Sequence, residues 1–181
     1  MKKLTLVLTL ALFSTGLLAQ QSRTEIASPA SSNDSRPNSD SVPSGYALSA
    51  QFQRVVVLRF KYQTDLLIGL ETMVKQEKIQ NAVILAGIGS VRNYCYHAVS
   101  NRTFPTKSVF VTDSTAPADI AGMNGYIIDG RVHAHIMFAD GKNAFGGHLE
   151  KGTNVFTFAI VTLGVLSNDV NLSRVDDTSY R

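Results

Sequence analysis

One segment constrains the fold of this chain more than any other: residues 130–149 are predicted to form a single β-hairpin. The sequence Asp-Gly-Lys-Asn at 140–143 is a turn signal between the two strands. This hairpin holds three of the four histidines of the chain, His133, His135 and His148. Successive side chains of a strand point to opposite faces, so His133 and His135 share a face and lie about 7 Å apart along the strand.

Two registers of the hairpin agree with this turn, and both place the three histidines on one face. If residues 141 and 142 are the central pair, His148 lies opposite His135; if residues 140 and 141 are central, it lies opposite His133. A bulge at residues 146–147, which are both glycine, would shift the alternation by one residue.

Three converging histidines suggest a metal site. Neutral imidazole suits zinc and related divalent ions, and three protein ligands leave one coordination position open to water or substrate. We therefore predict that His133, His135 and His148 bind a divalent metal such as zinc. The alternative is that they form hydrogen bonds within the sheet or at a subunit interface without a metal. The fourth histidine, His97, is expected in the core or on the surface.

A metal-dependent hydrolase would need a carboxylate or histidine beside the metal-bound water. Asp140 and Glu150 are the nearby carboxylates in the sequence. Asp140 is better explained by the turn, and Glu150 by a solvated strand end. The sequence has no Gly-x-Ser-x-Gly elbow, no phosphate loop and no His-Glu-x-x-His helix. Catalytic residues are therefore left unassigned, and the enzyme interpretation is not favoured.

The first residues are typical of a secretory signal peptide. A basic start at Lys2 and Lys3 precedes an apolar run at 4–13 and small residues at 14–19. We expect residues 1–19 to be removed by cleavage after Ala19 or Gln20, which leaves a periplasmic or secreted protein. The alternative, a retained membrane anchor, would need a longer apolar run and a basic stop-transfer cluster.

Charge and cysteine content narrow the function further. The chain has 17 basic and 14 acidic residues, and removal of Lys2 and Lys3 leaves 15 against 14. Surfaces that bind nucleic acid usually carry a basic run or a basic face, and no such run is present. Cys95 is the only cysteine, so the chain can form no internal disulfide, and it lies far from the site where a lipid would be attached.

The remaining segments predict an α+β domain in which one main helix packs on a mostly antiparallel sheet. Residues 20–45 are rich in serine and proline and are predicted to be a disordered tether. The domain itself spans 46–168, and 169–181 form a polar tail. A helix is expected from a cap at Thr64 and Asp65 to about Lys78. Strands are expected at 52–60, with both faces largely covered, at 81–86, 91–99, 108–112 and 154–166, and within 118–128, where two glycines interrupt the pattern.

The glycine-containing segment at 87–90 follows a predicted strand, as in a dinucleotide-binding turn. The third glycine and the following helix of that motif are both missing, so this reading is not favoured.

The hairpin resembles the signature of the plants-and-prokaryotes-conserved (PPC) domain family. The likeness lies in Gly-Arg-Val-His-Ala-His at 130–135, Asp-Gly at 140–141, Gly-Gly-His-Leu at 146–149 and Gly152, and it extends upstream through 65–92. It covers roughly residues 46–168. The resemblance implies an α+β fold with an antiparallel sheet, a homotrimer, and His133, His135 and His148 as the metal ligands.

The same resemblance carries a DNA-binding label, which fits this chain poorly. In plants the domain accompanies AT-hook motifs, and stand-alone bacterial members are often labelled as candidate DNA-binding proteins. Here Ser35-Arg36-Pro37 resembles an AT-hook only weakly. An exported protein would also have little access to the chromosome. Where the family often has Ala-Glu, this chain has Ala159-Ile160, so any role of that glutamate is lost.

The leading hypothesis is an exported PPC-domain trimer that binds a divalent metal and whose biological role is unknown. A DNA-binding protein and a metal-dependent hydrolase are the two alternatives.

Overall fold

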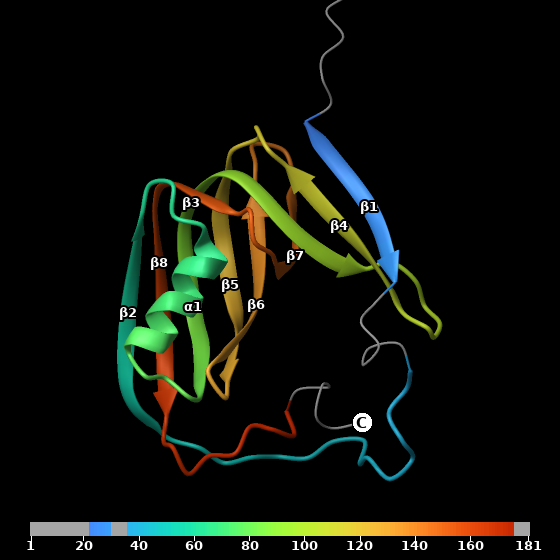
Figure 1. Cartoon of the computed structure of the whole chain (residues 1–181), viewed down its shortest axis with the longest axis vertical. Helices are drawn as coiled ribbons and strands as arrows, with labels where there is room; N and C mark the ends of the chain where they lie inside the picture. Colours follow the sequence, from blue (N-terminus) through green and yellow to red (C-terminus); the bar gives the residue numbers. More distant parts are fainter. Residues whose placement is uncertain (1–21, 30–35, 176–181) are drawn as a thin grey trace, which may run out of the picture.

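A computed structural model describes residues 22–29 and 36–175, which form a mostly antiparallel sheet with one helix, α1 (Leu66–Gln76), as predicted (Figure 1). The predicted signal peptide and the last residues of the predicted tail lie outside this part of the chain. The strands are β1 (Arg23–Pro29), β2 (Phe52–Lys61), β3 (Ala82–Val99), β4 (Lys107–Asp113), β5 (Ala118–Ile128), β6 (Arg131–Ala139), β7 (Ala144–Leu149) and β8 (Asn154–Leu166).

Strand β3 organises the sheet because it pairs with four other strands. Its first half lies between β5 and β8, and its second half pairs with β4 and, over a short stretch, with β7. The path β3-β5-β6-β7 therefore returns to β3 and forms a closed circuit of strands. This closure brings the predicted hairpin, β6 and β7, against the far end of β3.

The structure corrects the prediction of two separate strands at 81–86 and 91–99, which are parts of the single strand β3. The glycines between them allow close packing rather than a break. A Cβ at Gly89, where φ is +141°, would lie 2.2 Å from the carbonyl oxygen of Phe158 on β8. Shifts of register against β8 accompany this approach and let the long strand bend.

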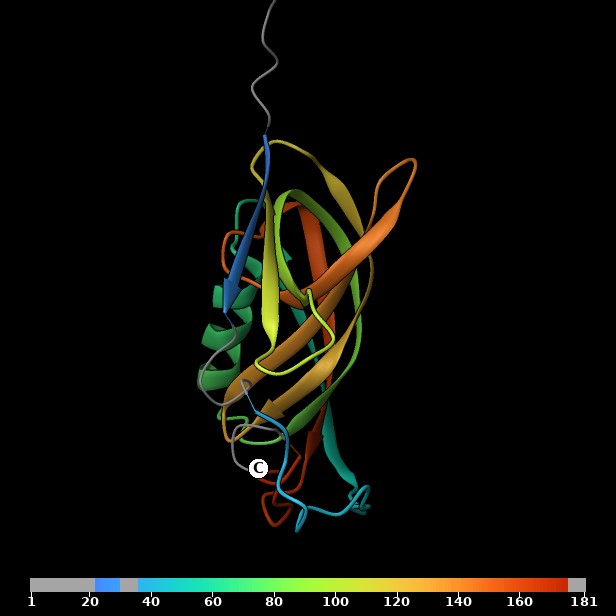
Figure 2. The same ribbon diagram turned by 90° about the vertical axis from the view of Figure 1, so that its right-hand side faces the viewer.

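Helix α1 packs on one side of the sheet (Figures 1 and 2). Its N-cap is Asp65, whose side chain accepts a hydrogen bond from the Ile68 N–H at 3.1 Å. Leu66, Leu70 and Val74 are almost fully buried against the sheet. The helix ends at Gln76, before the predicted Lys78, whose φ of 53° is incompatible with a helix.

The face of β2 that points away from the core is exposed, although both faces of this strand were predicted to be covered. Leu58 and Phe60 are buried, whereas Val55 and Val57 are 57% and 65% exposed. Strand β2 pairs only with β8 in the described residues, and its inner side chains pack on the core. A Val-rich sequence occurs both in strands with one covered face and in strands with two, so the sequence did not distinguish the two cases.

The predicted tether is also partly wrong, because Arg23–Pro29 form strand β1, antiparallel to β4. The side chains of β1 are largely exposed, including Ile26 at 64%. The strand is therefore held mainly by backbone pairing, which composition does not reveal. At the other end, Leu172 within the predicted polar tail is buried with Ile128 and Leu166.

The described part of the chain contains no helix with the length and apolar character needed to span a bilayer.

Candidate metal site

The hairpin positions the three predicted ligands on two paired strands. His133 and His135 lie on β6, and His148 lies directly opposite His135 on β7. Residues 140–143 form the loop, in which the Asp140 carboxylate accepts hydrogen bonds from the Lys142 and Asn143 N–H groups, each at 2.7 Å. The register with residues 141 and 142 at the centre is thus the observed one.

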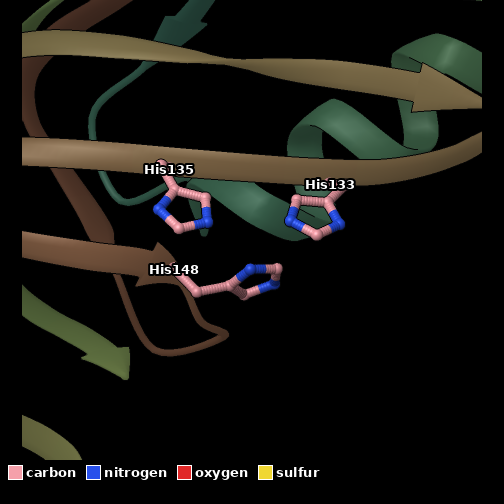
Figure 3. A group of neighbouring side chains, drawn as sticks. All are labelled: His133, His135 and His148. Carbon is pink, nitrogen blue, oxygen red and sulfur yellow. The ribbon is translucent and has the colours of Figure 1, made fainter. Parts of the chain in front are cut away.

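The three imidazoles converge on one face of the sheet (Figure 3). Each offers one ring nitrogen, and these nitrogens lie within 4.8 Å of one another. The His133 and His135 rings are nearly parallel, at 8°, with centroids 5.6 Å apart. The His148 ring stands almost perpendicular to both, with centroids 4.8 Å from His133 and 5.4 Å from His135.

Two glycines allow β7 to lie between β6 and β3. A Cβ at Gly146 would meet the carbonyl oxygen of Ile136 at 2.0 Å, and one at Gly147 would meet that of His97 at 2.2 Å. No shift of register occurs at these residues, so the alternation that places His148 on the histidine face is preserved. The Gly-Gly-His sequence is therefore a packing requirement of the site.

The structure connects His97 to the site and gives Glu150, a carboxylate that is close to the histidines in the sequence, a hydrogen-bond partner there. His97 on β3 lies directly opposite His148, and its Nδ1 is 2.6 Å from the Glu150 carboxylate. Both side chains are only about a quarter exposed, at 27% and 28%. Glu150 is therefore part of a hydrogen-bonded pair, not the solvated strand end that was predicted.

The local electrostatics favour the neutral form of His135. Partial burial lowers the pKa of His135, and the nearby His133 and His97 lower it further because two positive charges would repel. Metal ions bind the neutral ring, so this shift supports binding near neutral pH. Hydrogen bonds from Asn143 and Lys142 lower the pKa of Asp140, in keeping with its role in the turn.

The donors fit a divalent ion of the zinc type. Zinc bonds to imidazole nitrogen at about 2.0–2.1 Å, so two nitrogens in a tetrahedral site lie about 3.4 Å apart. The observed spacing of up to 4.8 Å is wider, so binding of such an ion would require the imidazole rings to move closer together. Three imidazole nitrogens would supply three of the four ligands of a tetrahedral zinc ion.

Next to the histidines the same face of the sheet is shallowly hollowed. A depression of about 420 Å³ is lined by His133 and His135 and by residues of β3 and β5, including Val83, Asn124 and Tyr126. Asn124 and Tyr126 are the direct cross-strand partners of His135 and His133.

The fold and the site together define an α+β domain with a candidate metal centre on one face of its sheet. Residues 47–167 match the sequence profile of the Plants and Prokaryotes Conserved (PCC) domain, the family abbreviated PPC above. The chain belongs to this family. Comparison with curated proteins gives no significant match.

Several solved structures share this fold. A metal-containing protein from Archaeoglobus fulgidus is 20% identical, with a TM-score of 0.57 over 75% of this chain and 96% of that one. A plant- and prokaryote-conserved protein from Pyrococcus horikoshii is 22% identical, with a TM-score of 0.56 over 69% and 87%. A protein from Bacteroides thetaiotaomicron, described as a candidate DNA-binding protein, is 14% identical, with a TM-score of 0.53 over 67% and 86%.

Proposed function

We propose that this chain is an exported PPC-domain protein that binds a divalent metal, such as zinc, through His133, His135 and His148. The convergence of the three ring nitrogens within 4.8 Å is the observation that carries this proposal. The description of the Archaeoglobus protein as metal-containing supports it. The site would hold the ion through three neutral imidazoles and leave one position for water or another ligand.

Metal analysis of protein purified without a histidine tag tests this proposal. We expect about one zinc or related ion per chain in the wild type, and strongly reduced content in His133→Ala and His148→Ala. Met137→Ala is the matched control, because Met137 is an exposed side chain of the same strand as His133 and lies outside the histidine group. A wild-type protein that stays metal-free when supplied with zinc would contradict the proposal.

We further propose that the protein is a homotrimer, as its family resemblance implies. An exposed apolar face on the adjacent strands β2, β3 and β8 supports self-association. This apolar face consists of Val55, Val57, Leu85, Ile88, Phe156 and Phe158, which are between 36% and 65% exposed. Apolar side chains grouped in this way on a soluble domain commonly mark an interface.

Export would follow from the signal-like start of the sequence. Strand β1 begins at Arg23, so cleavage after Ala19 or Gln20 would leave this strand in the mature protein. Cell fractionation and N-terminal sequencing test this part of the proposal. Cytoplasmic protein that retains Met1 would contradict it.

A metal-dependent hydrolase is the second candidate, and Glu150 is the observation that favours it. Its carboxylate is hydrogen-bonded to His97, whose ring stacks on that of His148, so a carboxylate–histidine pair lies one imidazole ring away from the proposed metal site. Zinc-loaded protein would then hydrolyse activated esters or phosphodiesters faster than the His148→Ala variant. Equal rates for the two proteins would exclude this candidate for those substrates.

DNA binding is less well supported. The Bacteroides neighbour is described as a candidate DNA-binding protein, but its likeness at 14% identity extends to the fold alone. The chain has 17 basic against 14 acidic residues, a small excess for a protein that binds phosphate backbones. Salt-dependent retardation of duplex DNA in a gel would support this function, and unshifted DNA at low salt would contradict it.

A further inference from the structure

Four aromatic rings lie in one row across four neighbouring strands. His135 on β6 lies opposite His148 on β7, and His148 lies opposite His97 on β3. His97 in turn lies opposite Phe110 on β4. His148, one of the three proposed ligands, therefore has the other ligands on one side and His97 on the other.

His97 is held between two rings. Its centroid is 4.7 Å from that of His148, with the planes 27° apart, and 5.0 Å from that of Phe110, with the planes 38° apart. Ring contacts on both sides limit how far the His97 ring can turn without loss of contact. The His148 ring is thus supported on the side facing away from His133 and His135.

Glu150 fixes the position of His97. A carboxylate only accepts hydrogen bonds, so Nδ1 of His97 carries the hydrogen that it donates to Glu150 at 2.6 Å. Glu150 is itself tied to β3, because its backbone N–H donates to the Cys95 carbonyl at 3.1 Å. The preceding residue, Leu149, is fully buried. The Glu150 carboxylate therefore directly follows β7, at a point where the backbone is hydrogen-bonded to β3 and the preceding side chain is buried.

We propose that Glu150 and His97 form a positioning pair that holds the His148 imidazole in the orientation needed for metal binding. His97 is outside the group of histidines whose nitrogens converge, so it acts through His148 and not as a ligand. The pair restricts the His148 side chain before the ion binds. Less conformational entropy is then lost on binding, so the ion binds more tightly. This inference rests on the proposed metal-binding function.

Metal affinity of four variants, measured by competition with a chelator for zinc, tests the inference. Partners of this kind typically change metal affinity by about 10- to 100-fold, and we expect a loss in this range for Glu150→Ala and His97→Ala. Glu150→Gln should stay within a few-fold of wild type, because its amide oxygen still accepts from Nδ1. His97→Phe keeps a ring against His148 but loses the anchor, so its loss should be intermediate.

A second measurement separates positioning from a general effect on folding. Cobalt-loaded Glu150→Ala should show an altered visible spectrum at unchanged metal stoichiometry, because the ligand geometry changes. The apo forms of Glu150→Gln and wild type should unfold at the same temperature. Glu71→Ala is the matched control: Glu71 is an exposed acid that pairs only loosely with Lys151, at 3.8 Å, and its loss should leave both affinity and spectrum unchanged.

The outcomes are distinct. A wild type that binds no metal would overturn the proposed function and this inference with it. A wild type that binds metal, with Glu150→Ala and His97→Ala equal to it in affinity and cobalt spectrum, would overturn the inference alone. A loss in Glu150→Gln as large as in Glu150→Ala would also overturn it, because the acceptor oxygen would then have no role in positioning.

Discussion

His148 on β7 and His97 on β3 are direct cross-strand partners whose rings stack with centroids 4.7 Å apart. This contact joins the hairpin that carries the three candidate ligands to the longest strand of the sheet. The candidate site is therefore built from three strands, although its three ligands come from two. It follows that its properties depend on the closure of the sheet as well as on the hairpin sequence.

Metal affinity should decrease as the pH falls. The pKa of His135 in the folded protein lies below 6.5, because of partial burial and the neighbouring His133 and His97. His135 is then neutral at higher pH and becomes protonated as the pH falls through this lowered pKa, where a proton competes with the ion. Chelator competition over a pH series should show full affinity near neutrality and a progressive loss as the pH falls through the lowered pKa of His135. Constant affinity across the series would contradict histidine ligation.

Gly147→Ala should destabilise the fold and weaken the site, whereas Gly141→Ala should do neither. A methyl group at Gly147 would meet the His97 carbonyl oxygen at 2.2 Å, and one at Gly141 in the turn would meet nothing within 4 Å. Overpacking of this kind costs about 1–3 kcal/mol, and more where backbone must move. Denaturant unfolding of the two variants measures the difference. Equal stability would show that β7 can shift away from β3 without cost.

Asp113→Ala should lower the free energy of unfolding by about 1–3 kcal/mol. Asp113 is 6% exposed, and its carboxylate accepts hydrogen bonds from the Thr115 and Ala116 N–H groups at 3.0 and 2.9 Å. The variant leaves these two donors without their acceptor. Denaturant unfolding measures the loss, with Asp119→Ala, an exposed aspartate of β5, as the control.

The same variant gives a test in acid. Burial acts to raise the pKa of Asp113, but its hydrogen bonds outweigh this effect and hold the pKa below 3.8. The charged carboxylate therefore stabilises the fold above the pKa that Asp113 has in the unfolded chain. This stabilisation is lost as the pH falls through the lower pKa that Asp113 has in the folded protein. The stability difference between wild type and Asp113→Ala should narrow below about pH 4. A difference that stayed constant into strong acid would contradict the role of the charge.

Ile88→Asp should break the proposed trimer, and Val99→Asp should leave it intact. Both residues are exposed on β3, at 54% and 68%, but only Ile88 belongs to the apolar face. A charge at Ile88 would have to be buried in the interface without a partner, which is costly. Light scattering coupled to size exclusion gives the mass of each form. A monomeric wild type would contradict the trimer itself.

Local sequence was sufficient to predict the hairpin and its three candidate ligands. The turn at 140–143 and the two-residue alternation of a strand depend only on neighbouring residues, so the common face of His133, His135 and His148 could be predicted without any knowledge of the rest of the chain. The segment 154–166 was predicted with the same bounds as β8, because β-branched and aromatic residues mark it, and a strand was expected within 118–128, where β5 lies.

The tertiary structure decided everything that depends on pairing between distant segments. His97 and Glu150 are 53 residues apart, and only the return of β7 to β3 brings them together. Likewise, β1 is a strand because it pairs with β4. One face of β2 is exposed because no other element of the described chain covers it. The physical reason is that side-chain alternation fixes which face a residue occupies, whereas the packing of the whole domain fixes which strand lies beside it.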